Sequence, residues 1–154
     1  MELLENLKTD YPDIKFVDGS KFVWSPAKNE LIYCSEQLAQ TTGTYSLLHE
    51  LGHALSDHQN FHTDTELIEI EREAWERAIV IAKHYGIEIP NDHIEDCLDT
   101  YRDWLLSRAT CPDCRLVGIQ SSRSLNYHCI NCSNKWSVPD EQTCATRRRL
   151  LKTN

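Results

Sequence analysis

Residues 44–58 read TYSLLHELGHALSDH, and this stretch decides the fold of the N-terminal part of the chain. Apolar residues recur in it at intervals of three and four, which indicates one buried face of a helix: Leu47, Leu48, Leu51, Ala54 and Leu55. His49 and His53 lie one helical turn apart, so both imidazoles can reach a single Zn²⁺. Glu50 lies between them, at the edge of the same face, where a carboxylate can take a proton from zinc-bound water.

A catalytic zinc site needs a third protein ligand and keeps one position open for water. The next helix, which Asp64 or Thr65 can cap and which is expected to run to Tyr85, offers several carboxylates: Glu66, Glu69, Glu71, Glu73 and Glu76. We predict Glu73 as the ligand, because it lies at the edge of the apolar stripe between Ile70 and Ala74. Glu69 and Glu76 are its main rivals, whereas His58 and His62 are expected to be solvated or to lie behind the ligands.

These residues predict hydrolysis of a peptide bond. Zinc would lower the pKa of its water to about 7 and polarise the scissile carbonyl. Glu50 would accept the water proton as general base and pass it to the leaving amine. A hydrogen-bond donor to the oxyanion is also expected, and Tyr45, His58 and Tyr85 are all candidates.

The remaining N-terminal residues predict an α+β domain over residues 1–109. We expect a short helix over 1–8, strands over 14–24 and 31–34, and a last helix from about Asn91 to Ala109. The expected fold is a zincin-like mini-domain of short antiparallel strands and three main helices. An exposed edge of its strands could hold an extended peptide substrate by pairing with it.

The segments HELGHALSDH and EIEREAWERA together resemble the ImmA/IrrE-type metallopeptidases over about residues 21–89. The resemblance implies a minimal gluzincin domain, in which His49, His53 and the glutamate of Glu73-Ala74 bind zinc and Glu50 is the base. It also implies a specific intracellular protein as substrate, often a transcriptional regulator. The chain departs from the family pattern after Ala74, where it has Trp75, and it shows no helix-turn-helix segment.

Two alternatives remain open at the level of sequence. The pairing of H-E-x-x-H with a C-terminal zinc ribbon is also similar to SprT-like proteases, which act on DNA-bound proteins. Those use a third histidine, so His58 or His62 would then replace Glu73 as ligand. The other alternative is a non-catalytic adaptor that uses two zinc ions to bind a protein or a nucleic acid. Glu50 favours the enzyme, because a structural site needs no base.

Two C-x-x-C pairs predict a second zinc site in residues 110–154. Cys111 and Cys114 are separated by 14 residues from Cys129 and Cys132. Four thiolates complete a tetrahedron and leave no open position, so this zinc is expected to be structural. The ribbon is too small to fold by burial alone, and zinc binding of about 10–16 kcal/mol would stabilise it.

Composition limits the class of protein. The 154 residues carry a formal net charge of -8, which argues against a dedicated nucleic-acid binder, although basic side chains exceed acidic ones in the ribbon. No apolar run is long enough for a signal peptide or a membrane span, and the paired cysteines favour a reducing, cytoplasmic compartment. Contact of the ribbon with nucleic acid or protein would use Tyr127, Lys135, Trp136 and the run Arg147, Arg148 and Arg149.

Overall fold

The computed structural model describes residues 2–139 and 148–151, and it confirms the α+β class. The four helices are α1 (Glu2–Asp10), α2 (Thr41–Leu55), α3 (Asp64–His84) and α4 (Asn91–Ala109). The first three strands are β1 (Lys15–Asp18), β2 (Val23–Ser25) and β3 (Glu30–Tyr33). The others are β4 (Ile119–Gln120), β5 (Asn126–His128), β6 (Lys135–Ser137) and β7 (Arg149–Leu150). Among the described residues, no helix combines the length and apolar character needed to cross a membrane.

Contacts divide the chain into two compact units. Unit 1 consists of Met1–Asn60 and Glu69–Ile94, and unit 2 of Phe61–Ile68 and Glu95–Asn154. The C-terminal strands therefore group with the first turn of α3 and with most of α4. This grouping differs from the boundary expected at 109/110, which remains a prediction about the parts that fold on their own.

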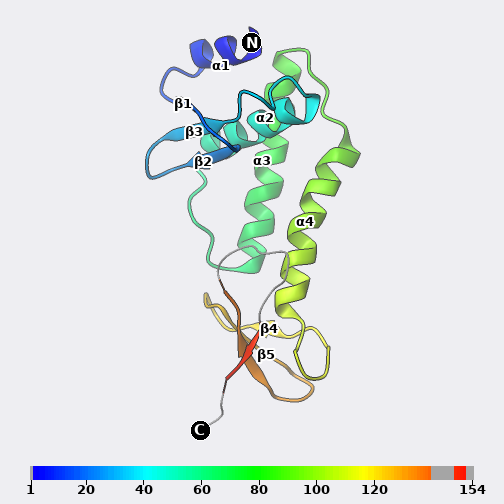
Figure 1. Ribbon diagram of the computed structural model, residues 1–154. Helices are drawn as coiled ribbons and strands as arrows, with labels where there is room; N and C mark the ends of the chain where they lie inside the picture. Colours follow the sequence, from blue (N-terminus) through cyan, green and yellow to red (C-terminus); the bar gives the residue numbers. More distant parts are fainter. Residues whose placement is uncertain (1, 140–147, 152–154) are drawn as a thin grey trace. The chain divides into compact units, whose positions relative to one another are not determined.

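The sheet of unit 1 is mixed rather than purely antiparallel. Its strand order is β1-β3-β2, with β1 parallel and β2 antiparallel to the central β3. The strand expected over residues 14–24 is in fact two strands, separated by residues 19–22, and β2 lies on the other side of β3 from β1. As a result β2 is an edge strand, and α2 packs against β2 and β3 (Figure 1).

Helices α2 and α3 approach each other at Gly52. A Cβ atom on this residue would overlap the backbone carbonyl of Ala74, so only glycine fits. Gly52 is buried and Ala74 is fully buried, which places two small residues at the contact point. The two helix backbones can therefore lie unusually close, and side chains near this point can share one site.

Helix α3 begins with a capping box. The Thr63 hydroxyl accepts a hydrogen bond from the Glu66 N–H, and the Glu66 carboxylate accepts one from the Thr63 N–H, both at 3.1 Å. Thr63 is thus the cap, instead of the expected Asp64 or Thr65. The helix buries a stripe that contains Leu67, Glu71, Ala74, Trp75, Ala78 and Ile81.

Unit 2 packs the C-terminal sheet onto the ends of two helices. The sheet is antiparallel in the order β4-β5-β6-β7. The Trp136 indole N–H donates to the Arg108 carbonyl at 2.9 Å, and the Tyr127 hydroxyl donates to the Asp64 carboxylate. The Arg108 guanidinium is buried and lies 4.4 Å above the Trp104 ring. These contacts fix the first turn of α3 and the last turns of α4 to the same sheet.

Replacing Gly52 by Ala is expected to lower the free energy of unfolding by about 1–3 kcal/mol, because the added methyl group must push the α3 backbone away. Urea unfolding followed by circular dichroism measures the change. Thr42→Ala, at an exposed position of the same helix, is the control and should change stability by no more than about 0.5 kcal/mol. Equal midpoints for Gly52→Ala and wild type would contradict the close approach.

Candidate metal centres

Two histidines of α2 and one glutamate of α3 converge in unit 1. His49 Nε2 lies 3.1 Å from Glu71 Oε2 and 3.1 Å from His53 Nε2, and His53 Nε2 lies 3.6 Å from Glu71 Oε2. All three side chains are buried or nearly so. Ligand atoms at 2.0–2.1 Å from a tetrahedral zinc ion would lie about 3.3–3.4 Å apart. The spacing of the three atoms therefore fits a zinc ion.

The structure brings Glu71, and not the expected Glu73, to the two histidines. Glu71 lies four residues after Leu67 and three before Ala74, so it belongs to the buried stripe of α3. Glu73 points away from that stripe, its side chain is 54% exposed, and it contacts His58. Helical spacing from Leu67 and Ala74 indicates Glu71, whereas the prediction of Glu73 relied on its closeness in sequence to Ile70 and Ala74. Glu71 lies three residues, slightly less than one helical turn, before Ala74, whose backbone approaches Gly52.

The charge of Glu71 suits a metal ligand. Burial alone would raise its pKa, but the hydrogen bonds and positive potential of His49 and His53 outweigh burial and lower the pKa to about 2. The low pKa favours the ionised carboxylate, which is the form that binds a metal. His49 Nδ1 is buried without a hydrogen-bond partner among the described residues, and the His49 ring stacks on Trp75 at a centroid distance of 4.2 Å. This stacking holds the His49 ring in place.

Glu50 is held beside this group by the sheet. The backbone N–H of Trp24 in β2 donates to Glu50 Oε2 at 2.7 Å. Trp24 pairs with Leu31 of β3 on its other side, so the outer edge of β2 faces Glu50. One carboxylate oxygen is thus fixed by the backbone, and Oε1 remains to accept a proton.

The three residues considered for the oxyanion are engaged elsewhere. The Tyr45 hydroxyl donates to the Glu88 carbonyl at 3.1 Å, and the Tyr85 hydroxyl donates to Asp10 at 2.6 Å. His58 Nδ1 lies 3.0 Å from His53 Nδ1, on the side of the His53 ring opposite to Glu71. His58 therefore contacts His53 from outside the His49–His53–Glu71 group and does not belong to that group. His62 is exposed near the start of α3.

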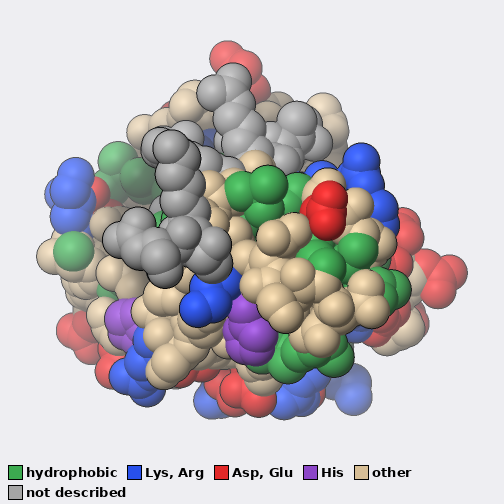
Figure 2. Space-filling view, turned by 90° about the horizontal axis from the view of Figure 1, so that it is seen from below, with side chains coloured by type: hydrophobic (Ala, Val, Ile, Leu, Met, Phe, Trp, Pro, Cys, Tyr) green, Lys and Arg blue, Asp and Glu red, His purple; other side chains and the backbone are tan. Residues whose placement is uncertain are grey.

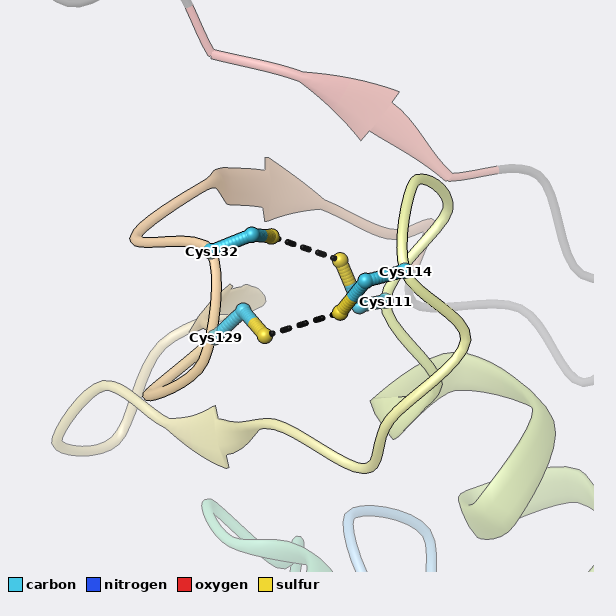
Figure 3. Close-up of side chains that lie close together, drawn as sticks. All are labelled: Cys111, Cys114, Cys129 and Cys132. Carbon is cyan, nitrogen blue, oxygen red and sulfur yellow. Dashed lines mark hydrogen bonds between the residues drawn. The ribbon is translucent and has the colours of Figure 1, made fainter.

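Four cysteine sulfurs converge in unit 2 (Figure 3). Cys111 and Cys114 follow α4, and Cys129 and Cys132 lie between β5 and β6. The Sγ atoms of Cys111 and Cys132 are 3.6 Å apart, those of Cys114 and Cys129 are 3.4 Å apart, and all four lie within 4.8 Å of one another. A tetrahedral zinc ion with Zn–S bonds of 2.3 Å would need spacings of about 3.8 Å. The group is therefore compatible with the predicted structural zinc.

The two cysteine loops have the same backbone geometry. In the first, the Cys111 N–H donates to the Leu116 carbonyl and the Arg115 N–H donates to the Cys111 carbonyl. In the second, Cys129 makes the equivalent bonds with Asn134 and Ser133. The residue after the second cysteine of each pair has a positive φ, 66° at Arg115 and 62° at Ser133. A hydrogen bond from the Leu116 N–H and one from Cys129 also lower the pKa of Cys114 to about 6, which favours a thiolate.

The aromatic residues considered for nucleic-acid contact lie in the core of the ribbon. Tyr127 and Trp136 are 1% and 0% exposed and stack on each other. Arg148 donates to the Thr110 carbonyl at 2.7 Å, and Arg147 lies outside the described residues. Lys135, in contrast, is exposed, so a partner of the ribbon would meet this side chain and not the two aromatic rings.

The zinc content of variants tests both groups. Native mass spectrometry of the wild type is expected to show two zinc ions per chain. Glu71→Ala should lose the ion of unit 1, because only two neutral ligands would remain, and Cys129→Ser should lose the other. Glu73→Ala should keep both ions at stoichiometric zinc. Loss of an ion from Glu73→Ala together with its retention in Glu71→Ala would reverse the assignment.

The chain matches a known protein family. Residues 6–111 match a peptidase family described as the IrrE N-terminal-like domain. No curated protein and no solved structure matches the chain. The matched region contains α2, α3 and the His49–His53–Glu71 group, and it ends at the first cysteine of the ribbon. The chain thus belongs to the IrrE N-terminal-like family, a family of peptidases, and carries in addition a C-terminal group of four cysteines.

Proposed function

We propose that the protein is a zinc-dependent endopeptidase. The observation that carries this proposal is the convergence of His49, His53 and Glu71 beside a carboxylate held by the backbone of β2. His49 and His53 would each bind zinc through Nε2, and Glu71 would bind it through a carboxylate oxygen. This ligand set replaces the one proposed with Glu73, and it agrees better with the gluzincin pattern of two histidines and a glutamate than with a site of three histidines.

Zinc bound there would supply a Lewis acid for the scissile carbonyl and lower the pKa of a water molecule toward 7. Glu50 Oε1 would take the proton of that water and later give it to the leaving amine. The bond from the Trp24 N–H to Glu50 Oε2 fixes the direction of this carboxylate, so that proton transfer does not require it to reorient. The ring of Trp75 excludes water from one side of His49.

The edge strand β2 would position the substrate. Its outer edge faces Glu50 and is free of any other strand of the unit 1 sheet. An extended peptide that pairs with β2 would place a scissile bond beside the base. Binding by backbone pairing requires an unfolded or extended segment, which favours a flexible region of a protein as the substrate class.

The proposed substrate is a specific protein inside the cell. A transcriptional regulator is the first candidate, because the ImmA/IrrE-type metallopeptidases that the sequence resembles often act on such proteins. The ribbon would contact this protein rather than a nucleic acid, since its aromatic rings are buried while five large apolar side chains among its described residues are more than half exposed: Leu116, Val117, Ile119, Ile130 and Leu150. Figure 2 shows that hydrophobic side chains also reach the surface in separate groups on the face it views.

Glu50→Gln tests the proposal, because it removes the base and retains the shape of the side chain. Labelling of new protein N-termini, after incubation of a cell extract with the zinc-loaded protein, measures cleavage. The wild type should generate a small set of new termini, and Glu50→Gln should generate them at least about 100-fold more slowly. The variant should still hold two zinc ions. Equal cleavage by both proteins, or no new terminus with the wild type, would contradict the proposal.

A further inference from the structure

A row of three hydrogen-bonded side chains leads from the proposed zinc site of unit 1 to the surface. His53 Nδ1 lies 3.0 Å from His58 Nδ1, and His58 Nε2 lies 3.1 Å from Glu73 Oε2. His53 and His58 are buried, whereas Glu73 is about half exposed. Glu73 also lines a surface hollow of about 570 Å³ together with Asp57 and Arg77. Glu73, at the outer end of this row, is therefore in contact with solvent, whereas His53, at the inner end, is buried.

The backbone at the end of α2 explains why His58 faces His53. Asp57 has a positive φ of 51°, its N–H donates to the Ala54 carbonyl, and the His58 N–H donates to the His53 carbonyl. These two bonds form a Schellman motif, in which the residue after the left-handed position folds back against the last turn of the helix. The contact that closes this motif is usually apolar. Here it joins two imidazole rings, at a centroid distance of 5.1 Å.

The hydrogen bonds determine which ring nitrogens carry protons. A carboxylate can only accept, so His58 Nε2 must donate to Glu73. A neutral His58 then has a lone pair on Nδ1, and His53 Nδ1 must donate to it. A neutral His53 with its proton on Nδ1 has its lone pair on Nε2, the nitrogen that faces His49 and Glu71. This is the protonation state that a zinc ligand needs.

We propose that His58 and Glu73 are positioning residues that hold His53 in the orientation and tautomer that bind zinc. The inference rests on the proposed zinc site and adds a role for two residues outside the ligand set. A hydrogen-bonded partner behind a ligating imidazole fixes its ring and raises its basicity. Glu73 acts through His58, and the half-exposed position of Glu73 means that water can replace it in part. Loss of His58 should therefore weaken zinc binding more than loss of Glu73.

The tautomers can be observed directly in the wild type. A long-range ¹H–¹⁵N correlation spectrum of the full chain, labelled at its seven histidines and loaded with zinc, distinguishes protonated, bare and metal-bound ring nitrogens. The expected pattern is a proton on His53 Nδ1, a metal-bound His53 Nε2, and a proton on His58 Nε2 with a bare Nδ1. A proton on His58 Nδ1 would overturn the proposal, because His53 could then not donate to it.

Zinc affinity provides the second measurement, by competition with a chromophoric chelator. His58→Ala is expected to weaken the unit 1 site by roughly 10–100-fold, and Glu73→Ala by less. His58→Asn and His58→Gln form a matched pair. The Asn side-chain oxygen can occupy the place of Nδ1 and should restore most of the affinity, whereas Gln places its polar end near Nε2 and should not. Glu69→Ala, an exposed carboxylate of the same helix, is expected to bind zinc as the wild type does.

Glu71→Ala separates failure of this inference from failure of the proposed function. If Glu71→Ala abolishes zinc binding in unit 1 while both His58→Ala and Glu73→Ala bind within twofold of the wild type, the positioning role is wrong and the zinc site stands. If Glu71→Ala also binds as the wild type does, the proposed site itself is wrong. Circular dichroism of each metal-free variant checks that the helices are intact.

Discussion

The close approach of α2 and α3 at Gly52 and Ala74 is the constraint on which unit 1 depends. A Cβ at Gly52 would overlap the Ala74 backbone, so the two helices can meet at this distance only with glycine on α2. On α2, Gly52 lies one residue before His53. On α3, Ala74 lies three residues after Glu71. The same helix pair therefore brings the ring nitrogens of both histidines and the carboxylate oxygen within 3.6 Å of one another. Close packing of the helices and assembly of the metal site have one cause.

The remaining features of the site follow from elements packed around this helix pair. β2 fixes Glu50 through a backbone N–H, Trp75 stacks on His49, and the Schellman motif at the end of α2 places His58 behind His53. Glu50, His49 and His53 are thus each held by a neighbour that lies outside α2. Such support keeps a site in one geometry before zinc and substrate bind. Family membership and site geometry point to the same chemistry, since the family is one of peptidases.

The sequence predicted the parts of the site that lie on one element. Two histidines four apart on an amphipathic helix, and two C-x-x-C pairs, have fixed local geometry, and the structure brings each set together. The predicted ligand Glu73 lies two positions after Glu71, the glutamate that the structure brings to the histidines. The two glutamates differ only in the face of α3 on which they lie. That face depends on the whole buried stripe and on the contact at Gly52. The parallel pairing of β1 with β3 likewise depends on contacts distant in sequence.

Unit 2 shows the same difference between local and distant contacts. Spacing of the cysteines indicated the ribbon, but nothing in the sequence indicated that Arg108 would be buried against Trp104, or that Tyr127 would donate to Asp64. The Arg108 guanidinium lies against the rings of Trp104 and Tyr127, with its Nε 3.9 Å from a carboxylate oxygen of Asp64, and these surroundings arise only on folding. These contacts explain why the residues after Thr110 group with the first turn of α3 and with α4.

The central claim is that His49, His53 and Glu71 form one zinc site. A crystal structure of the zinc-loaded protein, with diffraction recorded on both sides of the zinc absorption edge, tests it most directly. We expect an anomalous peak at about 2.0–2.2 Å from His49 Nε2, His53 Nε2 and a Glu71 oxygen, and a second peak among the four cysteine sulfurs. A peak bound by His58 or Glu73, or a peak at the cysteines and none at His49, would contradict it.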